Sequence, residues 1–144
     1  MATRFQVVMD CADPARLASF WAAALGYQLQ PPPEGYESWE AFLSAIGIPE
    51  ERWNSASAVI DPDGVGSRIY FQQVPEPKVV KNRVHLDLNV GGGSATPLDE
   101  RRRRVDAEVE RLITLGANKL RPVEEHGEYW VVMQDPEGNE FCVQ

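Results

Sequence analysis

The sequence predicts an α+β fold made of two similar halves, each built from one strand, one helix and three further strands. Two segments with helical periodicity end in Leu-Gly, so that ALGY at 24–27 matches TLGA at 114–117. Each half later carries a strong turn sequence, DPDG at 61–64 and DPEG at 135–138. The segments around these turns alternate between apolar and polar residues, which is typical of strands.

In the first half, a strand over 5–11 leads into a helix. Asp13 is the expected N-cap, Pro14 the first helical residue and Gly26 the left-handed cap at the end. The apolar residues that follow the stripe of a core-facing helix are Leu17, Phe20, Trp21, Ala24 and Leu25. Further strands are expected over 27–30, 56–61 and 67–74.

An insert over 31–54 distinguishes the first half from the second. Ser38 is the expected N-cap of a short helix in this insert. The apolar residues at helical spacing behind it are Trp39, Phe42, Leu43 and Ile46. Because an apolar helix must pack on something, the insert is a natural lid or rim for a cleft.

The second half repeats the plan with a strand over 83–90, a connector over 91–97 and a helix over 98–116. The residues expected to face the core from this helix are Val105, Val109, Leu112 and either Ile113 or Leu115. The remaining strands are expected over 118–122, 128–134 and 140–144. We therefore expect one domain over 1–144, with modules at about 1–78 and about 79–144.

One face of the predicted sheets is polar or mixed on several strands. The residues that share this face by alternation are Arg4, Gln6, Val8, Asp10, Arg83, His85, Asp87, Asn89, Glu140, Cys142 and Gln144. On 67–74 the pattern leaves open whether Tyr70 and Gln72, or Ile69 and Phe71, join them. Two such half-sheets curled around one another would form a cleft.

Composition argues against several functions. A net charge of -8 speaks against nucleic acid, which requires a basic surface. The run RRRR at 101–104 is balanced by nearby acids, so we interpret it as a solvated helix face with internal ion pairs. No apolar run approaches the ~20 residues that span a membrane, and the first residues lack the apolar region of a signal peptide. We expect a cytoplasmic protein whose two cysteines are reduced.

Four stretches, DPARLASFWAAALGY, KNRVHLDLNV, EVERLITLGA and YWVVMQDPEGNEFCV, resemble the vicinal oxygen chelate superfamily. They are most similar to its glyoxalase-like members. The resemblance implies two βαβββ modules that form an open, cup-shaped mixed sheet, the glyoxalase/bleomycin resistance/dihydroxybiphenyl dioxygenase fold. It also implies a small-molecule ligand and a homodimer.

Metal-dependent relatives place ligands on the inner faces of four strands. The matching positions here are Gln6, Tyr70 or Gln72, His85 and Cys142, so the chain departs from the family pattern at two of four positions. The resemblance implies one divalent metal (Zn, Ni or Mn) held by His85, Gln6 and Cys142, with His85 also as the catalytic residue. The expected ligand pocket consists of Tyr70, Gln72, Asp87 and Trp130.

Two functions follow from this resemblance. The first is a metal-assisted lyase or isomerase acting on a small oxygenated molecule. The alternative is a non-catalytic protein that sequesters a drug or other small molecule, with His85 a neutral histidine bonded to Asp87 and Cys142 a half-buried thiol. Glyoxalase I activity itself is not expected, because the glutamates that serve as ligand and base are missing at the matched positions.

Overall fold

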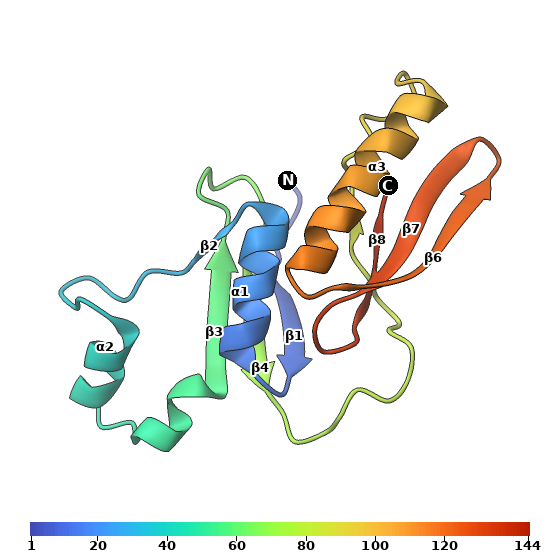
Figure 1. Ribbon diagram of the computed structural model, residues 1–144. Helices are drawn as coiled ribbons and strands as arrows, with labels where there is room; N and C mark the ends of the chain where they lie inside the picture. Colours follow the sequence, from blue (N-terminus) through green and yellow to red (C-terminus); the bar gives the residue numbers. More distant parts are fainter. The chain divides into compact units, whose positions relative to one another are not determined.

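The computed structural model describes residues 1–144 and divides them into two compact units, Met1–Pro77 and Lys78–Gln144. Each unit contains a four-stranded mixed sheet and one long helix (Figure 1). This arrangement confirms the predicted α+β class and the duplicated strand and helix order. None of the helices has the length and apolar character needed to cross a membrane.

The first unit follows the predicted element order. Its elements are β1 (Val7–Cys11), α1 (Pro14–Leu25), β2 (Gln28–Leu29), α2 (Trp39–Ala45), the 3-10 helix η1 (Glu50–Ser55), β3 (Ala56–Ile60) and β4 (Ile69–Gln73). The strand order is β1-β4-β3-β2, and β1 runs parallel to β4. The Asp13 side chain caps α1 by accepting a hydrogen bond from Arg16 N at 3.2 Å, and Gly26 ends the helix with a φ of 69°. Both caps are as predicted.

Burial on β4 resolves the alternation that the sequence leaves open. Ile69 and Phe71 are buried, together with Leu17 and Trp21 of α1. Since neighbouring residues of a strand point to opposite faces, Tyr70 and Gln72 lie on the face of the sheet that points away from α1.

The insert helix α2 forms as predicted but does not pack as expected. Ser38 caps it, because its side chain accepts a hydrogen bond from Ala41 N at 3.1 Å. However, no residue of α2 is buried, and the helix stands apart from the sheet of its unit (Figure 1). The rings of Tyr36 and Trp39 each contact the Phe42 ring edge to face. Trp39 nevertheless lines a hollow of the first unit together with Ile60 and Arg68, so α2 contributes to a rim there, and a lid over a cleft stays a prediction.

The second unit repeats the topology of the first. Its elements are β5 (Asp87–Leu88), α3 (Leu98–Thr114), β6 (Asn118–Glu125), β7 (Glu128–Gln134) and β8 (Glu140–Val143). The strand order is β5-β8-β7-β6, and β5 runs parallel to β8. The side chains that fill its core are Val105, Val109, Leu112, Val131, Met133, Phe141 and Val143. Of the two alternatives for the last core position of α3, neither holds, because Ile113 and Leu115 are both exposed.

The predicted strand over 83–90 shrinks to Asp87–Leu88. Its partner β8 is short, and the Glu140 side chain at the start of β8 accepts a hydrogen bond from Asn82 N at 3.0 Å. The residues between Asn82 and Leu86 therefore leave the ladder. Val84, which alternation assigns to the buried side, is 82% exposed as a result.

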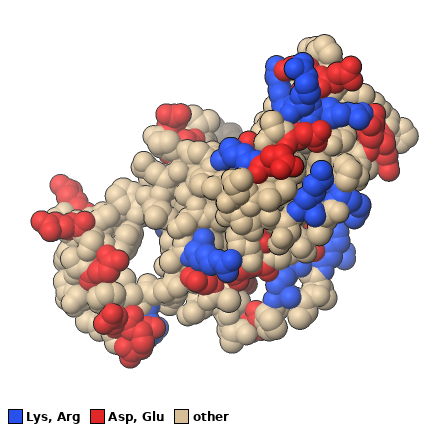
Figure 2. Space-filling view, viewed as in Figure 1, with Lys and Arg blue, Asp and Glu red and all other residues tan.

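The arginines of α3 only partly follow the predicted pattern. Three of them pair within the helix: Arg103 and Arg104 with Glu100, and Arg111 with Glu108. Arg101 and Arg102 instead reach the neighbouring hairpin and pair with Glu128 and Glu124. Blue and red side chains accordingly lie interleaved over the upper end of α3 (Figure 2). This surface is charge-balanced, as predicted for a solvated helix face with ion pairs.

A partly buried hydrogen bond joins α3 to β7. The Tyr129 hydroxyl donates to Asp106 Oδ1 at 2.6 Å, and burial together with this bond raises the pKa of Tyr129 to about 12.

We expect Tyr129→Phe to lower the free energy of unfolding by about 1–2 kcal/mol, because Asp106 loses its donor while the ring remains. Urea unfolding measures this change. Tyr36→Phe is the control, since exposed Tyr36 keeps its ring contacts and should change stability by less than about 0.5 kcal/mol. Equal stabilities for the two variants would contradict the prediction.

Candidate metal and ligand site

The candidate site lies on the face of the second sheet that points away from α3. Asp87 of β5 is opposite Cys142 of β8, and Leu88 is opposite Val143. Leu88 and Val143 are buried on the α3 side, so alternation places Asp87 and Cys142 together on the other face. The parallel pairing therefore brings together two polar side chains that lie near the beginning and the end of the unit's sequence.

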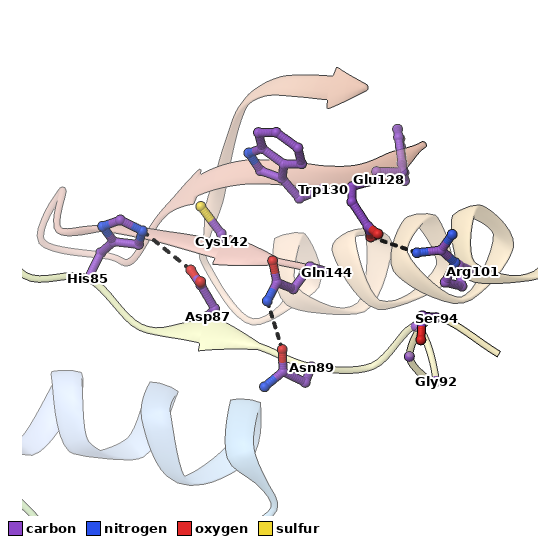
Figure 3. A pocket seen from close by; sticks show the side chains of 13 residues that line it. His85, Asp87, Asn89, Gly92, Ser94, Arg101, Glu128, Trp130, Cys142 and Gln144 are labelled. Atoms are coloured by element: carbon purple, nitrogen blue, oxygen red, sulfur yellow. Dashed lines mark hydrogen bonds and ion pairs between the residues drawn. The ribbon is translucent and has the colours of Figure 1, made fainter. Parts of the chain in front are cut away.

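His85 completes a cluster of possible metal donors. Its Nε2 lies 3.3 Å from Asp87 Oδ1, and one donor atom from each of His85, Asp87 and Cys142 lies within 4.8 Å of the other two (Figure 3). The side chains of His85 and Asp87 are 41% and 42% exposed, so a ligand has access to them. The contact with Asp87 is compatible with both interpretations of His85, as a hydrogen-bonded histidine and as a ligand-binding residue.

Cys142 is a thiol rather than a thiolate in this environment. Burial is the main reason why the pKa of Cys142 lies above its ordinary value, and the charge and hydrogen bond of Asp87 raise the pKa further. Lys81 and Arg121 act in the opposite direction but do not reverse the shift. Cys142 is therefore not a preformed nucleophile, and binding to a metal would require it to release a proton.

The cluster lines one end of a cavity of about 650 Å³ within the second unit. This volume falls in the range of ~300–1,000 Å³ that is common for small-molecule sites. Trp130 of β7 contributes an aromatic wall beside Cys142 (Figure 3). In the middle of the cavity, Gln144 Nε2 donates to Asn89 Oδ1 at 2.9 Å.

The other end of the cavity is formed by residues 91–94 and by Arg101 of α3. Arg101 Nη1 lies 2.6 Å from Glu128 Oε2, and Arg101 Nη2 donates to Gly127 O at 3.0 Å. Gly92 has a φ of 98°, and a Cβ at this position would lie 2.4 Å from Arg104 Nη1. The positive φ favours glycine at this position, whereas the end of the Arg104 side chain could move away from a Cβ.

Arg101 and Glu128 are absent from the residues that the sequence pattern predicts for the site. A signal for Arg101 exists nevertheless. Helical neighbours lie three and four positions away, and Arg101 has no acidic residue at any of these spacings, unlike Arg103 and Arg104. An arginine of this kind must find its partner outside its own helix.

Three predicted site residues, Gln6, Tyr70 and Gln72, lie in the first unit. The Gln6 side-chain oxygen, which is the atom that would bind a metal, accepts a hydrogen bond from Arg68 Nη1 at 2.9 Å. The Arg68 guanidinium also lies over the Tyr70 ring, 5.3 Å from its centroid, and donates to Gln30 Oε1 at 2.7 Å. The polar face of this unit is thus organised around Arg68, which the predicted site does not include.

The two units have the duplicated topology that the resemblance to the vicinal oxygen chelate superfamily implies. A family model described as a glyoxalase-like domain matches residues 6–144. The chain therefore belongs to the glyoxalase-like domain family. No curated protein matches the chain significantly.

Several solved structures share this fold. A glyoxalase/bleomycin resistance protein/dioxygenase family enzyme from Burkholderia phytofirmans PsJN has 20% identity and a TM-score of 0.61, with 96% of this chain and 94% of that chain covered. A possible glyoxalase from Bacillus cereus has 16% identity and a TM-score of 0.59, with 96% and 95% covered.

A mutant of the fosfomycin resistance protein FosX from Listeria monocytogenes, complexed with Mn(II) and 1S,2S-dihydroxypropylphosphonic acid, has 11% identity and a TM-score of 0.62. Its alignment covers 100% of this chain and 90% of that chain. At these identities the likeness concerns the fold alone.

Proposed function

We propose that this chain is a glyoxalase-like enzyme of lyase or isomerase type, which binds one divalent metal and a small oxygenated substrate in the cavity of the second unit. The supporting observation is the cluster of nitrogen, oxygen and sulfur donors on His85, Asp87 and Cys142, within 4.8 Å of one another. Zinc accepts this mixture of ligands, whereas manganese prefers oxygen. Among the three metals that the resemblance suggests, zinc therefore fits the donor set best.

The chemistry of such a site follows from its residues. A metal held there would supply Lewis acidity to neighbouring oxygens of the substrate. His85 and Asp87 would hold and orient that metal, so in this proposal they act as ligands rather than as groups that transfer a proton. Trp130 provides an apolar surface against which the carbon skeleton of a substrate can lie. His85 would thus be a catalytic residue through the metal that it holds.

Gln6 is not part of the proposed donor set. Its side-chain oxygen is already engaged by Arg68, and a metal would have to displace that hydrogen bond. Asp87, which the sequence suggests as a pocket residue, supplies an oxygen in its place. The three donors of the second unit would leave a further coordination position for water or substrate.

Zinc analysis tests the proposal. Protein incubated with zinc and freed of excess should retain about one ion per chain, and His85→Ala should lose it because only two donors remain. Elemental analysis by mass spectrometry gives the stoichiometry. The matched control is His126→Ala, which removes the only other histidine, an exposed residue of the β6–β7 turn. Retention of zinc by His85→Ala, or no retention by the parent protein, would overturn the proposal.

Sequestration of a small molecule is the second candidate function. The raised pKa of Cys142 favours it, because the thiolate required for a metal site is not preformed. The cavity volume suits a drug-sized ligand without any catalytic chemistry. A parent protein that retains no zinc would therefore support this function over the first.

Compartment and assembly stay predictions from the sequence. The expected cytoplasmic location rests on the sequence alone. The expected homodimer rests on the family resemblance alone.

A further inference from the structure

We propose that Arg101 forms an anion subsite at the end of the cavity opposite His85, Asp87 and Cys142. The ligand would then carry neighbouring oxygens at one end and a carboxylate or similar anionic group at the other. Binding of the neighbouring oxygens at His85, Asp87 and Cys142 rests on the proposed function. The anion subsite rests on Arg101 and its own contacts.

Arg101 is held in place before any ligand arrives. Its side chain is only 15% exposed, and its stem packs on the connector, since a Cβ on Gly91 would lie 3.5 Å from Arg101 Cβ and Cγ. The Arg101 Nε atom is buried and has no hydrogen-bond partner within the protein. The guanidinium thus has donor capacity that the fold does not use, and Arg101 lines the cavity in which an acceptor could reach this group.

The present partner of Arg101 is easily displaced. Glu128 contacts Arg101 through one carboxylate oxygen, and its own side chain is 61% exposed. Water can therefore solvate the Glu128 carboxylate when it leaves Arg101, although Arg101 itself is largely buried. The hydrogen bond from Arg101 Nη2 to Gly127 O does not involve the Glu128 carboxylate, so it can keep the guanidinium positioned when Glu128 moves away. The N–H groups of the planar Arg101 guanidinium can then donate hydrogen bonds to the oxygens of an anion.

The spacing along the chain sets the length of the ligand. Asp87 and Gly91 are four residues apart, which corresponds to about 13 Å in an extended segment. The side chains at both ends reach inward, so a somewhat shorter molecule connects them. Trp130, Asn89 and Gln144 line the stretch between. An elongated ligand with a flat middle and an anionic tail matches this lining.

Two kinds of measurement test the inference. With zinc-loaded protein, calorimetry compares 3,4-dihydroxycinnamate with its neutral amide, which has the same neighbouring oxygens. We expect the acid to bind about tenfold more tightly, and Arg101→Gln to abolish this preference while binding of the amide is unchanged. Glu128→Gln should strengthen binding of the acid several-fold, because it removes the competing carboxylate. Arg103→Gln, an exposed arginine on the same helix, is the control and should change nothing.

The second measurement requires no metal. The Arg101 Nε–H resonance of the parent protein should shift saturably on addition of methylphosphonate, and at lower concentrations in Glu128→Gln. Equal binding of acid and amide, or no shift of this resonance, would overturn the anion subsite. A resonance that responds while the amide fails to bind zinc-loaded protein would support the subsite and overturn the proposed function alone.

Discussion

Replacing Asp135 with alanine is expected to lower the free energy of unfolding by about 3 kcal/mol or more. Asp135 begins the turn before β8 and is the only fully buried charged side chain among residues 1–144. Its Oδ1 accepts hydrogen bonds from Glu137 N at 2.9 Å and Asn139 N at 3.0 Å, and Asn139 Nδ2 donates to both carboxylate oxygens. Alanine would leave these part-buried donors without an acceptor.

Urea unfolding followed by far-ultraviolet circular dichroism measures this loss. Asp135→Asn keeps one carbonyl acceptor and should lose roughly half as much stability. Asp61→Ala is the matched control, because Asp61 occupies the equivalent turn of the first unit and accepts hydrogen bonds from Asp63 N, Val65 N and Gly66 N. That turn is largely exposed to water, so its donors can be solvated instead. A loss at Asp135 no larger than at Asp61 would show that burial of the turn does not matter.

These two turns illustrate what the sequence can predict. DPDG and DPEG are recognisable because an aspartate side chain can bond to backbone groups two or more residues further on, and both do so. The turn sequences alone do not predict that Asp135 is buried while the turn at Asp61 is largely exposed. It depends on what packs above each turn in three dimensions.

The helices were predictable for a similar reason. Asp13 and Gly26 mark the ends of α1 through local hydrogen bonds and backbone geometry, which neighbouring residues determine. The strand over 83–90 was predicted too long because pairing depends on a distant partner. Alternation continues through Val84, but β8 offers too few residues to pair with it.

Half of the candidate site could be predicted by alternation alone. Asp87 and Cys142 share a face because β5 pairs with β8, and His85, which precedes the strand, contacts Asp87. The polar character of these three residues already indicated that face. The engagement of Gln6 by Arg68 could not be predicted, because it depends on the register between β1 and β4. The same holds for Arg101, whose partner comes from a different element of the unit.

Zinc binding to the cluster is expected to tighten about tenfold per pH unit between about pH 7 and about pH 8.5. Because burial and Asp87 raise the pKa of Cys142, the thiol holds its proton throughout this range. Each zinc ion that binds the sulfur must release that proton, so a lower proton concentration favours binding. Competition with a chelator of known affinity at each pH gives the slope.

Cys142→Ser should remove this slope and weaken zinc binding by about 100-fold, because a serine hydroxyl does not ionise in the same range and is a poor zinc ligand. Cys11→Ser is the matched control. Cys11 lies in β1 and its thiol donates to Gln72 O at 3.6 Å, so the slope should persist in this variant. A slope near zero in the parent protein would mean that zinc binds without the sulfur. His85 and Asp87 would then be the only donors of the cluster in use, which is too few for a specific zinc site.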